Sequence, residues 1–90
     1  MSSPSFQGMD VGAVRELAVQ FGQRATDIDN LLQQLTTMLS GTAWQGADAT
    51  RFRDDWNSRH APALRNVANS LRDAQSQATS NAQQQEDASR

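Results

Sequence analysis

Apolar residues recur at alternating spacings of three and four over the first half of the chain. They are Val11, Val14, Ala18, Phe21, Ala25, Ile28, Leu32, Leu35 and Leu39. This heptad pattern is typical of an amphipathic helix that packs along one seam. Asp10 precedes the pattern as a capping residue and Ser40-Gly41 follows it as a stop, so we predict a helix over about 11–40.

A second apolar column lies beside this seam. Leu17, Leu31 and Met38 occupy it, and Arg24 is its polar member. One hairpin partner covers a single seam, whereas a stripe of this width contacts two neighbouring helices, as in a four-helix bundle. The first helix is therefore predicted to need a neighbour outside its own hairpin.

The second half of the chain carries the same period after Gly46. We assign its apolar seam to Ala49, Phe52, Trp56, His60, Leu64, Val67, Leu71, Ala74 and Ala78. Two consecutive spacings of four, on either side of His60, form a stutter in the heptads, and Pro62 falls inside it. Because proline removes a backbone hydrogen bond, we predict a helix over about 47–80 that bends near Pro62.

The two ends of the chain contain little that can pack. Residues 1–9 hold Pro4, Gly8 and several serines, and residues 81–90 have no large apolar side chain, so both are predicted to be flexible. The fold class is all-α, a helix-turn-helix hairpin over residues 10–80 with its turn at 41–46. The positions expected to pack within the hairpin or in a dimer are Val14, Leu17, Phe21, Ile28, Leu32, Leu35, Phe52, Trp56, Leu64, Val67 and Leu71.

Composition argues against several classes of function. The chain has 90 residues, no cysteine and a net charge of −2 with the two signs interspersed, so we expect no thiolate metal site and no nucleic-acid partner. The sequence has no signal-peptide pattern and no apolar run of membrane-spanning length, so stable membrane insertion is not expected.

Candidate catalytic groups are few. His60 is the single histidine, and on the seam it is expected to be a packed or interfacial imidazole rather than a metal ligand. Asp54 and Asp55 are adjacent, so on a helix they point about 100° apart and form no facing pair. We predict no catalytic residue, no metal and no cofactor, and an enzyme built on carboxylates is the weakest alternative.

The stretch SGTAWQGADA places Trp44 among residues typical of a turn. One interpretation is that the indole closes the open end of the hairpin while Gln45 and Gly46 reverse the chain. The other is that a ring in a turn buries little of its surface within its own hairpin and serves as a binding anchor.

The W-x-G triplet at Trp44 and Gly46, midway between two heptad helices, resembles the WXG-hundred family of small type VII secretion substrates. These are the early-secreted-antigen-like proteins of actinobacteria and firmicutes, and the resemblance covers about residues 8–82. It implies that two hairpins pair, as a homodimer or heterodimer, into an antiparallel four-helix bundle. It also implies export of the folded dimer, without a cleavable signal peptide, by a machine driven by the type VII secretion ATPase.

In the resembling family the export signal combines the W-x-G turn with the partner's C-terminal tail, which carries a Y-x-x-x-[DE] motif. This chain has no tyrosine, and Ala82 to Glu86 is the nearest match in spacing. The resemblance thus implies Trp44, Gly46 and Glu86 as recognition residues. Either a partner supplies the tyrosine, or the motif is degenerate here, or the protein accompanies another substrate.

We expect a homodimer first, because only Arg24 and His60 are polar among the seam positions. A heterodimer with another W-x-G protein is the alternative pairing. The alternative function is a cytosolic dimeric coiled-coil adaptor, in which Trp44 only closes the hairpin.

Overall fold

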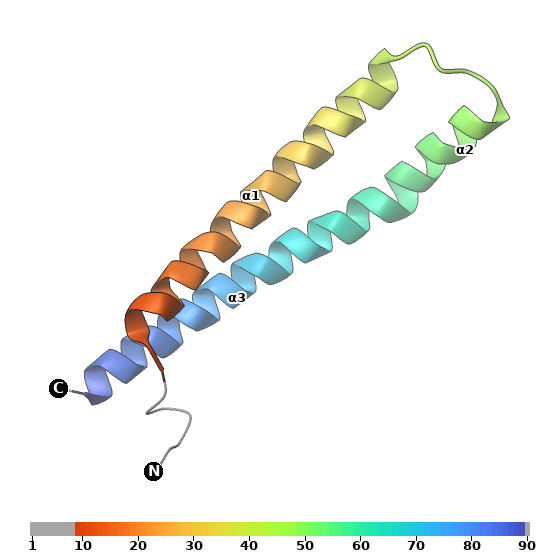
Figure 1. Cartoon of the computed structure of the whole chain (residues 1–90). Coiled ribbons are helices and arrows are strands. Elements are labelled where there is room, and N and C mark those ends of the chain that lie inside the picture. The colour runs from red at the N-terminus through yellow and green to blue at the C-terminus, as the bar shows by residue number, and fades with distance from the viewer. Residues whose placement is uncertain (1–8, 90) are drawn as a thin grey trace.

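The computed structural model describes residues 9–89, which form two long antiparallel helical rods joined by one turn (Figure 1). The first rod is α1 (Val11–Gly41), and the second consists of α2 (Ala47–Asp55), a π-helical turn (Trp56–His60) and α3 (Ala61–Ala88). No strand occurs within the described range. The predicted all-helical hairpin is therefore confirmed. It measures 63 × 18 × 14 Å with a radius of gyration of 19.6 Å, against about 12 Å for a compact domain of this length.

The ends of α1 lie where the sequence places them. Asp10 Oδ1 accepts a hydrogen bond from the Ala13 backbone N–H at 3.0 Å, which satisfies one of the free donors of the first turn. The helix ends at Gly41, one residue beyond the predicted boundary. After the turn, α2 begins directly behind Gly46.

The core of the hairpin lies in the half next to the turn. Leu32, Trp56 and Ala61 form its buried centre, where Leu32 is 5% and Trp56 6% exposed. The partly buried side chains packed against this centre are Ile28, Leu35, Leu39 and Leu64. The Trp56 indole Nε1–H donates to Thr36 Oγ1 at 2.9 Å, so the one polar atom of the ring is satisfied.

The other half of the hairpin is held by small residues. Ala18, Ala25, Ala68 and Ala82 are its buried positions. The side-chain amide of Gln75 lies over Gly22, where an added Cβ would be 2.7 Å from it. Among residues 9–89 no large side chain is fully buried, so a single hairpin has a thin core.

The stutter in the second helical segment takes the form of a π turn. The Ala61 N–H bonds to the Trp56 carbonyl, five residues back, and this wider turn absorbs the extra residue of the two consecutive spacings of four. Pro62 follows in the first turn of α3, and the rod continues past it (Figure 1). The interruption that we expected as a bend near Pro62 is thus a local widening of the helix.

The π turn also corrects the predicted seam of this rod. The buried positions after it are Ala61, Ala68 and Ala82, whereas His60 and Val67, each one residue earlier, are exposed. Small side chains allow the two helices to approach closely, and this close packing outweighs the gain from burying the larger Val67 side chain within the hairpin.

The prediction that residues 81–90 form a flexible tail is wrong for most of this segment. Helix α3 continues to Ala88, Ala82 is completely buried, and Glu86 forms an ion pair with Arg15 at 3.1 Å. Our prediction depended on large apolar residues, whereas this end of the hairpin buries Ala82 and joins Arg15 to Gln83 and Glu86. Of the predicted flexible N-terminus, residues 1–9, all but Met9 lie outside the described part of the chain.

Candidate interaction surface

The turn between α1 and α2, which contains Trp44, lies at the end of the hairpin opposite the start of α1 and the end of α3 (Figure 1). The Trp44 side chain is 43% exposed. Gly46 has φ of +114° and ψ of 177°, a conformation that is essentially restricted to glycine. The glycine of the W-x-G triplet therefore has a backbone reason, since the chain enters α2 through a conformation that other residues rarely adopt.

Aromatic rings continue from Trp44 onto the second rod. The Phe52 ring lies 6.2 Å from Trp44, 6.4 Å from Trp56 and 6.2 Å from His60 between centroids. Phe52 and His60 are exposed, and Trp56 is buried. His60 is thus not packed in the seam of the single chain, while an interfacial position in a dimer stays a prediction.

Arg53 reaches from α2 back to the turn and to the end of α1. Its guanidinium donates from Nε to the Leu39 carbonyl at 2.9 Å, from Nη1 to the Trp44 carbonyl at 2.7 Å and from Nη2 to the Thr42 carbonyl at 3.0 Å. Our sequence reasoning missed this residue. The available signal was that α1 has no basic side chain in its last turn to meet the free carbonyls.

One long side of the hairpin carries polar contacts between the rods, and we name it the polar side. Arg15 pairs with Glu86, Asp29 pairs with Arg72, and Gly22 lies against Gln75. The α1 residues in these contacts each lie four positions after a member of one column, namely the half-buried Val11 and the buried Ala18 and Ala25. A step of four residues is a rotation of about +40° about the helix axis.

The opposite side is apolar, and we name it the apolar side. On α1 it carries Leu17, Leu31 and Met38, with Arg24 as the charged member of the same column, one residue before the buried column and hence about 100° in the other direction. Because the rods are antiparallel, residues in the equivalent position on α3 face the same way, and Val67 is one of them. Phe52 of α2 lies on this side also, and the half-buried residues beside the seam are Val14, Phe21, Ile28, Leu35, Leu64 and Leu71.

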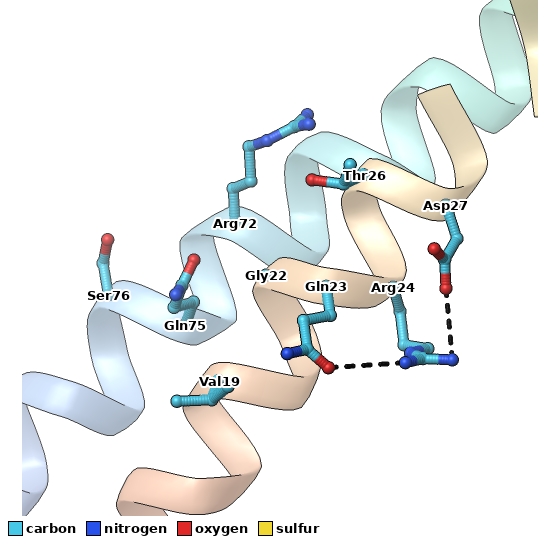
Figure 2. Close-up of a pocket in the computed structure, with 9 residues that line it drawn as sticks. All are labelled: Val19, Gly22, Gln23, Arg24, Thr26, Asp27, Arg72, Gln75 and Ser76. Atoms are coloured by element: carbon cyan, nitrogen blue, oxygen red, sulfur yellow. Dashed lines mark hydrogen bonds and ion pairs between the residues drawn. The ribbon is translucent and has the colours of Figure 1, made fainter. Parts of the chain in front are cut away.

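A shallow depression on the polar side is shown in Figure 2. Val19 and Gly22 of α1 and Gln75 of α3 contribute to its lining, and Arg24 pairs with Asp27 at its rim at 3.1 Å. Within residues 9–89 no three His, Cys, Asp or Glu side chains gather in a metal-binding cluster. Asp54 is exposed and Asp55 lies 3.7 Å from Arg59, so neither carboxylate joins a second one.

The predicted recognition residues do not meet within one chain. Trp44 and Gly46 lie at the turn, whereas Glu86 lies near the C-terminal end of α3, at the other end of the hairpin (Figure 1). The hairpin itself packs Leu32 and Trp56, half-buries Val14, Phe21, Ile28, Leu35, Leu64 and Leu71, and leaves Leu17, Phe52 and Val67 exposed.

Comparison with known proteins gave no match: no family model, curated protein or solved structure resembles the chain significantly. Over the described range, none of the helices has both the length and the apolar character that crossing a bilayer requires.

Proposed function

We propose that the protein is a helical-hairpin substrate or export partner of a type VII secretion system, which leaves the cell as a folded dimer. The observation that carries the proposal is the tip of the hairpin, where an indole that is 43% exposed precedes a glycine with φ of +114°. A rigid aromatic side chain displayed on a fixed turn is the kind of anchor that protein partners bind.

The apolar side supports the dimer. Leu31 is 50% and Met38 63% exposed on a chain whose core is thin, and a second hairpin that covered them would remove apolar area from water at about 25 cal/mol per Å². A row of exposed large apolar side chains on one side of a helix is typical of a site of protein association. The proposed arrangement is a four-helix bundle of two antiparallel hairpins.

An antiparallel dimer also gives Glu86 a place in the proposal. Within one chain Glu86 and Trp44 lie at opposite ends of the hairpin. In the proposed antiparallel dimer, the second copy would place its C-terminal end beside the turn of the first. The proposed recognition surface then contains Trp44 and Gly46 of one copy and Glu86 of the other. A heterodimeric partner with its own tail motif fits the same arrangement.

The test is the ratio of secreted to intracellular protein in a host that has the secretion machine. We expect Trp44→Ala to lower this ratio at least about tenfold, the scale of losing one anchoring aromatic residue. Val19→Ala is the matched control, because Val19 is exposed to a similar degree but lies on the polar side. Glu86→Gln is the appropriate tail variant, since truncation after Ser80 would remove the buried Ala82.

Circular dichroism and dimer mass must be measured on each variant. A well-folded, dimeric Trp44→Ala protein that is secreted as well as the wild type would refute the recognition role of Trp44. Secretion that does not depend on the ATPase of the machine would refute the proposed route.

The second candidate function is a cytosolic dimeric adaptor. The apolar side favours it as much as it favours an export dimer, because covering Leu17, Leu31 and Val67 requires a partner and no particular destination. The two candidate functions predict different results for substitution of Trp44 in the turn. For an adaptor, Trp44→Ala alters hairpin stability and no protein reaches the culture supernatant.

A further inference from the structure

The C-terminal end of α1 lacks the usual ways of satisfying its last carbonyls. The residue after Gly41 is Thr42, in an extended conformation, and among residues 9–89 only Gly46 has a positive φ. The end of α1 is therefore not closed by a left-handed glycine, nor by a basic side chain in its own last turn.

Arg53 supplies the missing basic group from the other rod. Its three hydrogen bonds, to the carbonyls of Leu39, Thr42 and Trp44, run from the last turn of α1 through the loop, at 2.9, 3.0 and 2.7 Å. Each is a bond from a cation, which is stronger than a neutral bond. The Thr42 carbonyl also accepts from the Trp44 N–H at 2.8 Å, so this single oxygen joins the side chain of Arg53 to the backbone of Trp44.

The same guanidinium contacts the Trp44 ring. The Arg53 Cζ atom lies 5.8 Å from the ring centroid, within the range of a cation–π interaction, and the Phe52 ring lies 6.2 Å from that centroid. Backbone and ring of Trp44 are thus both held from α2, while 43% of the side chain stays accessible.

We propose that Arg53 is the positioning residue of the Trp44 turn, holding the indole in one orientation before a partner arrives. Its role in recognition rests on the proposed function of Trp44, whereas its role in ordering the turn does not. A ring that is already ordered loses less conformational entropy on binding, which raises affinity without any new contact. Lysine cannot replace Arg53, because one ammonium lacks the planar fork that meets three carbonyls.

The ordering of the turn is measured on the full-length protein labelled with 5-fluorotryptophan. Fluorine NMR gives one signal for Trp44 and one for Trp56, and Trp44→Phe assigns them. We expect Arg53→Gln and Arg53→Lys both to move the Trp44 signal toward its position in the unfolded chain, while the Trp56 signal stays. Amide hydrogen exchange at Trp44 should rise at least about tenfold, and exchange at Leu32 should not change.

Arg51→Gln is the control, since it removes the same charge from α2 at an exposed residue whose one ion-pair partner among residues 9–89 is Asp48. An unchanged Trp44 signal and unchanged exchange in a folded Arg53→Gln protein would overturn the inference. Circular dichroism confirms folding, and Arg53→Lys, which keeps the charge, separates loss of the fork from loss of charge.

Secretion of the same variants separates this inference from the proposed function. We expect the ratio of secreted to intracellular protein for Arg53→Gln and Arg53→Lys to fall toward the ratio for Trp44→Ala. The ratio for Arg51→Gln should match that of the wild type. If the turn loosens while secretion stays normal, and Trp44→Ala still abolishes it, Trp44 is a recognition residue that needs no positioning and the inference is overturned. If Trp44→Ala is secreted normally, the proposed function fails, and the NMR and exchange results still decide whether Arg53 orders the turn.

Discussion

The two long sides of the hairpin differ in how many of their side chains find a partner within one chain. On the polar side, Arg15 meets Glu86 and Asp29 meets Arg72 across the rods. On the apolar side, Leu31 and Val67 face solvent with no polar atom to bind water. Exposed ion pairs contribute little to stability, whereas burying apolar area contributes much. The difference indicates that the apolar side is where a second chain gains most.

Placing a charge on the apolar side should have the largest effect on the proposed dimer. Leu31→Glu would bury one unpaired carboxylate per chain in the proposed dimer, so we expect the dissociation constant to rise at least about 100-fold. Analytical ultracentrifugation over a concentration series measures it. Gln34→Glu adds the same charge at an exposed position on the outer face of α1 and should leave the constant unchanged. Equal effects of the two variants would contradict the assignment of the sides.

Removing core side chains should separate hairpin packing from dimer packing. Leu32→Ala is expected to cost about 2–5 kcal/mol, because Leu32 is buried inside the single hairpin. Phe21 is only half-buried there, so Phe21→Ala reaches that range of about 2–5 kcal/mol only where a partner covers the ring. Thermal unfolding at several protein concentrations distinguishes them. A midpoint that moves by only a degree or two for Leu32→Ala would show that the core is elsewhere.

A substitution at Pro62 tests the π turn, which keeps the polar side and the apolar side in register along the second rod. Pro62→Ala restores a backbone N–H next to this turn without changing the register, so we expect stabilisation by about 1 kcal/mol, the net value of one hydrogen bond. Denaturant unfolding measures the change, and the dimer mass should stay the same. A clear loss of stability would mean that the proline ring itself contributes to packing.

The smallest effect is expected on the polar side. Arg72→Gln removes the ion pair with Asp29, in which both side chains are a little under half exposed, so the cost should be below about 1 kcal/mol. The dimer dissociation constant should not change. A large shift of that constant would place the polar side in the interface and reverse the comparison.

Much of this architecture follows from the heptads. The spacing of apolar residues from Val11 to Leu39, capped by Asp10, predicts α1 and its second apolar column, and the structure leaves Leu17, Leu31 and Met38 of that column exposed. The positive φ of Gly46 agrees with a turn at the W-x-G triplet. These features depend on local sequence, because side-chain period and backbone conformation are set within a few residues.

Other features depend on contacts between the rods, and the sequence pattern alone misplaced or missed them. The close packing of Ala68 and Ala82 against α1 depends on helix approach, which no period of large residues reveals. The pairing of Glu86 with Arg15 joins residues 71 positions apart and extends α3 beyond the predicted end. Arg53 donates to one carbonyl of α1 and two carbonyls of the turn, so its role is visible only once the turn is built.

The mass of the purified wild-type chain in solution tests the central claim most directly, namely that the apolar side is covered by a second copy. Native mass spectrometry and sedimentation at tens of micromolar should give a species of twice 9.9 kDa that is helical and dissociates on dilution. A stable, fully helical monomer of 9.9 kDa under those conditions would contradict the claim.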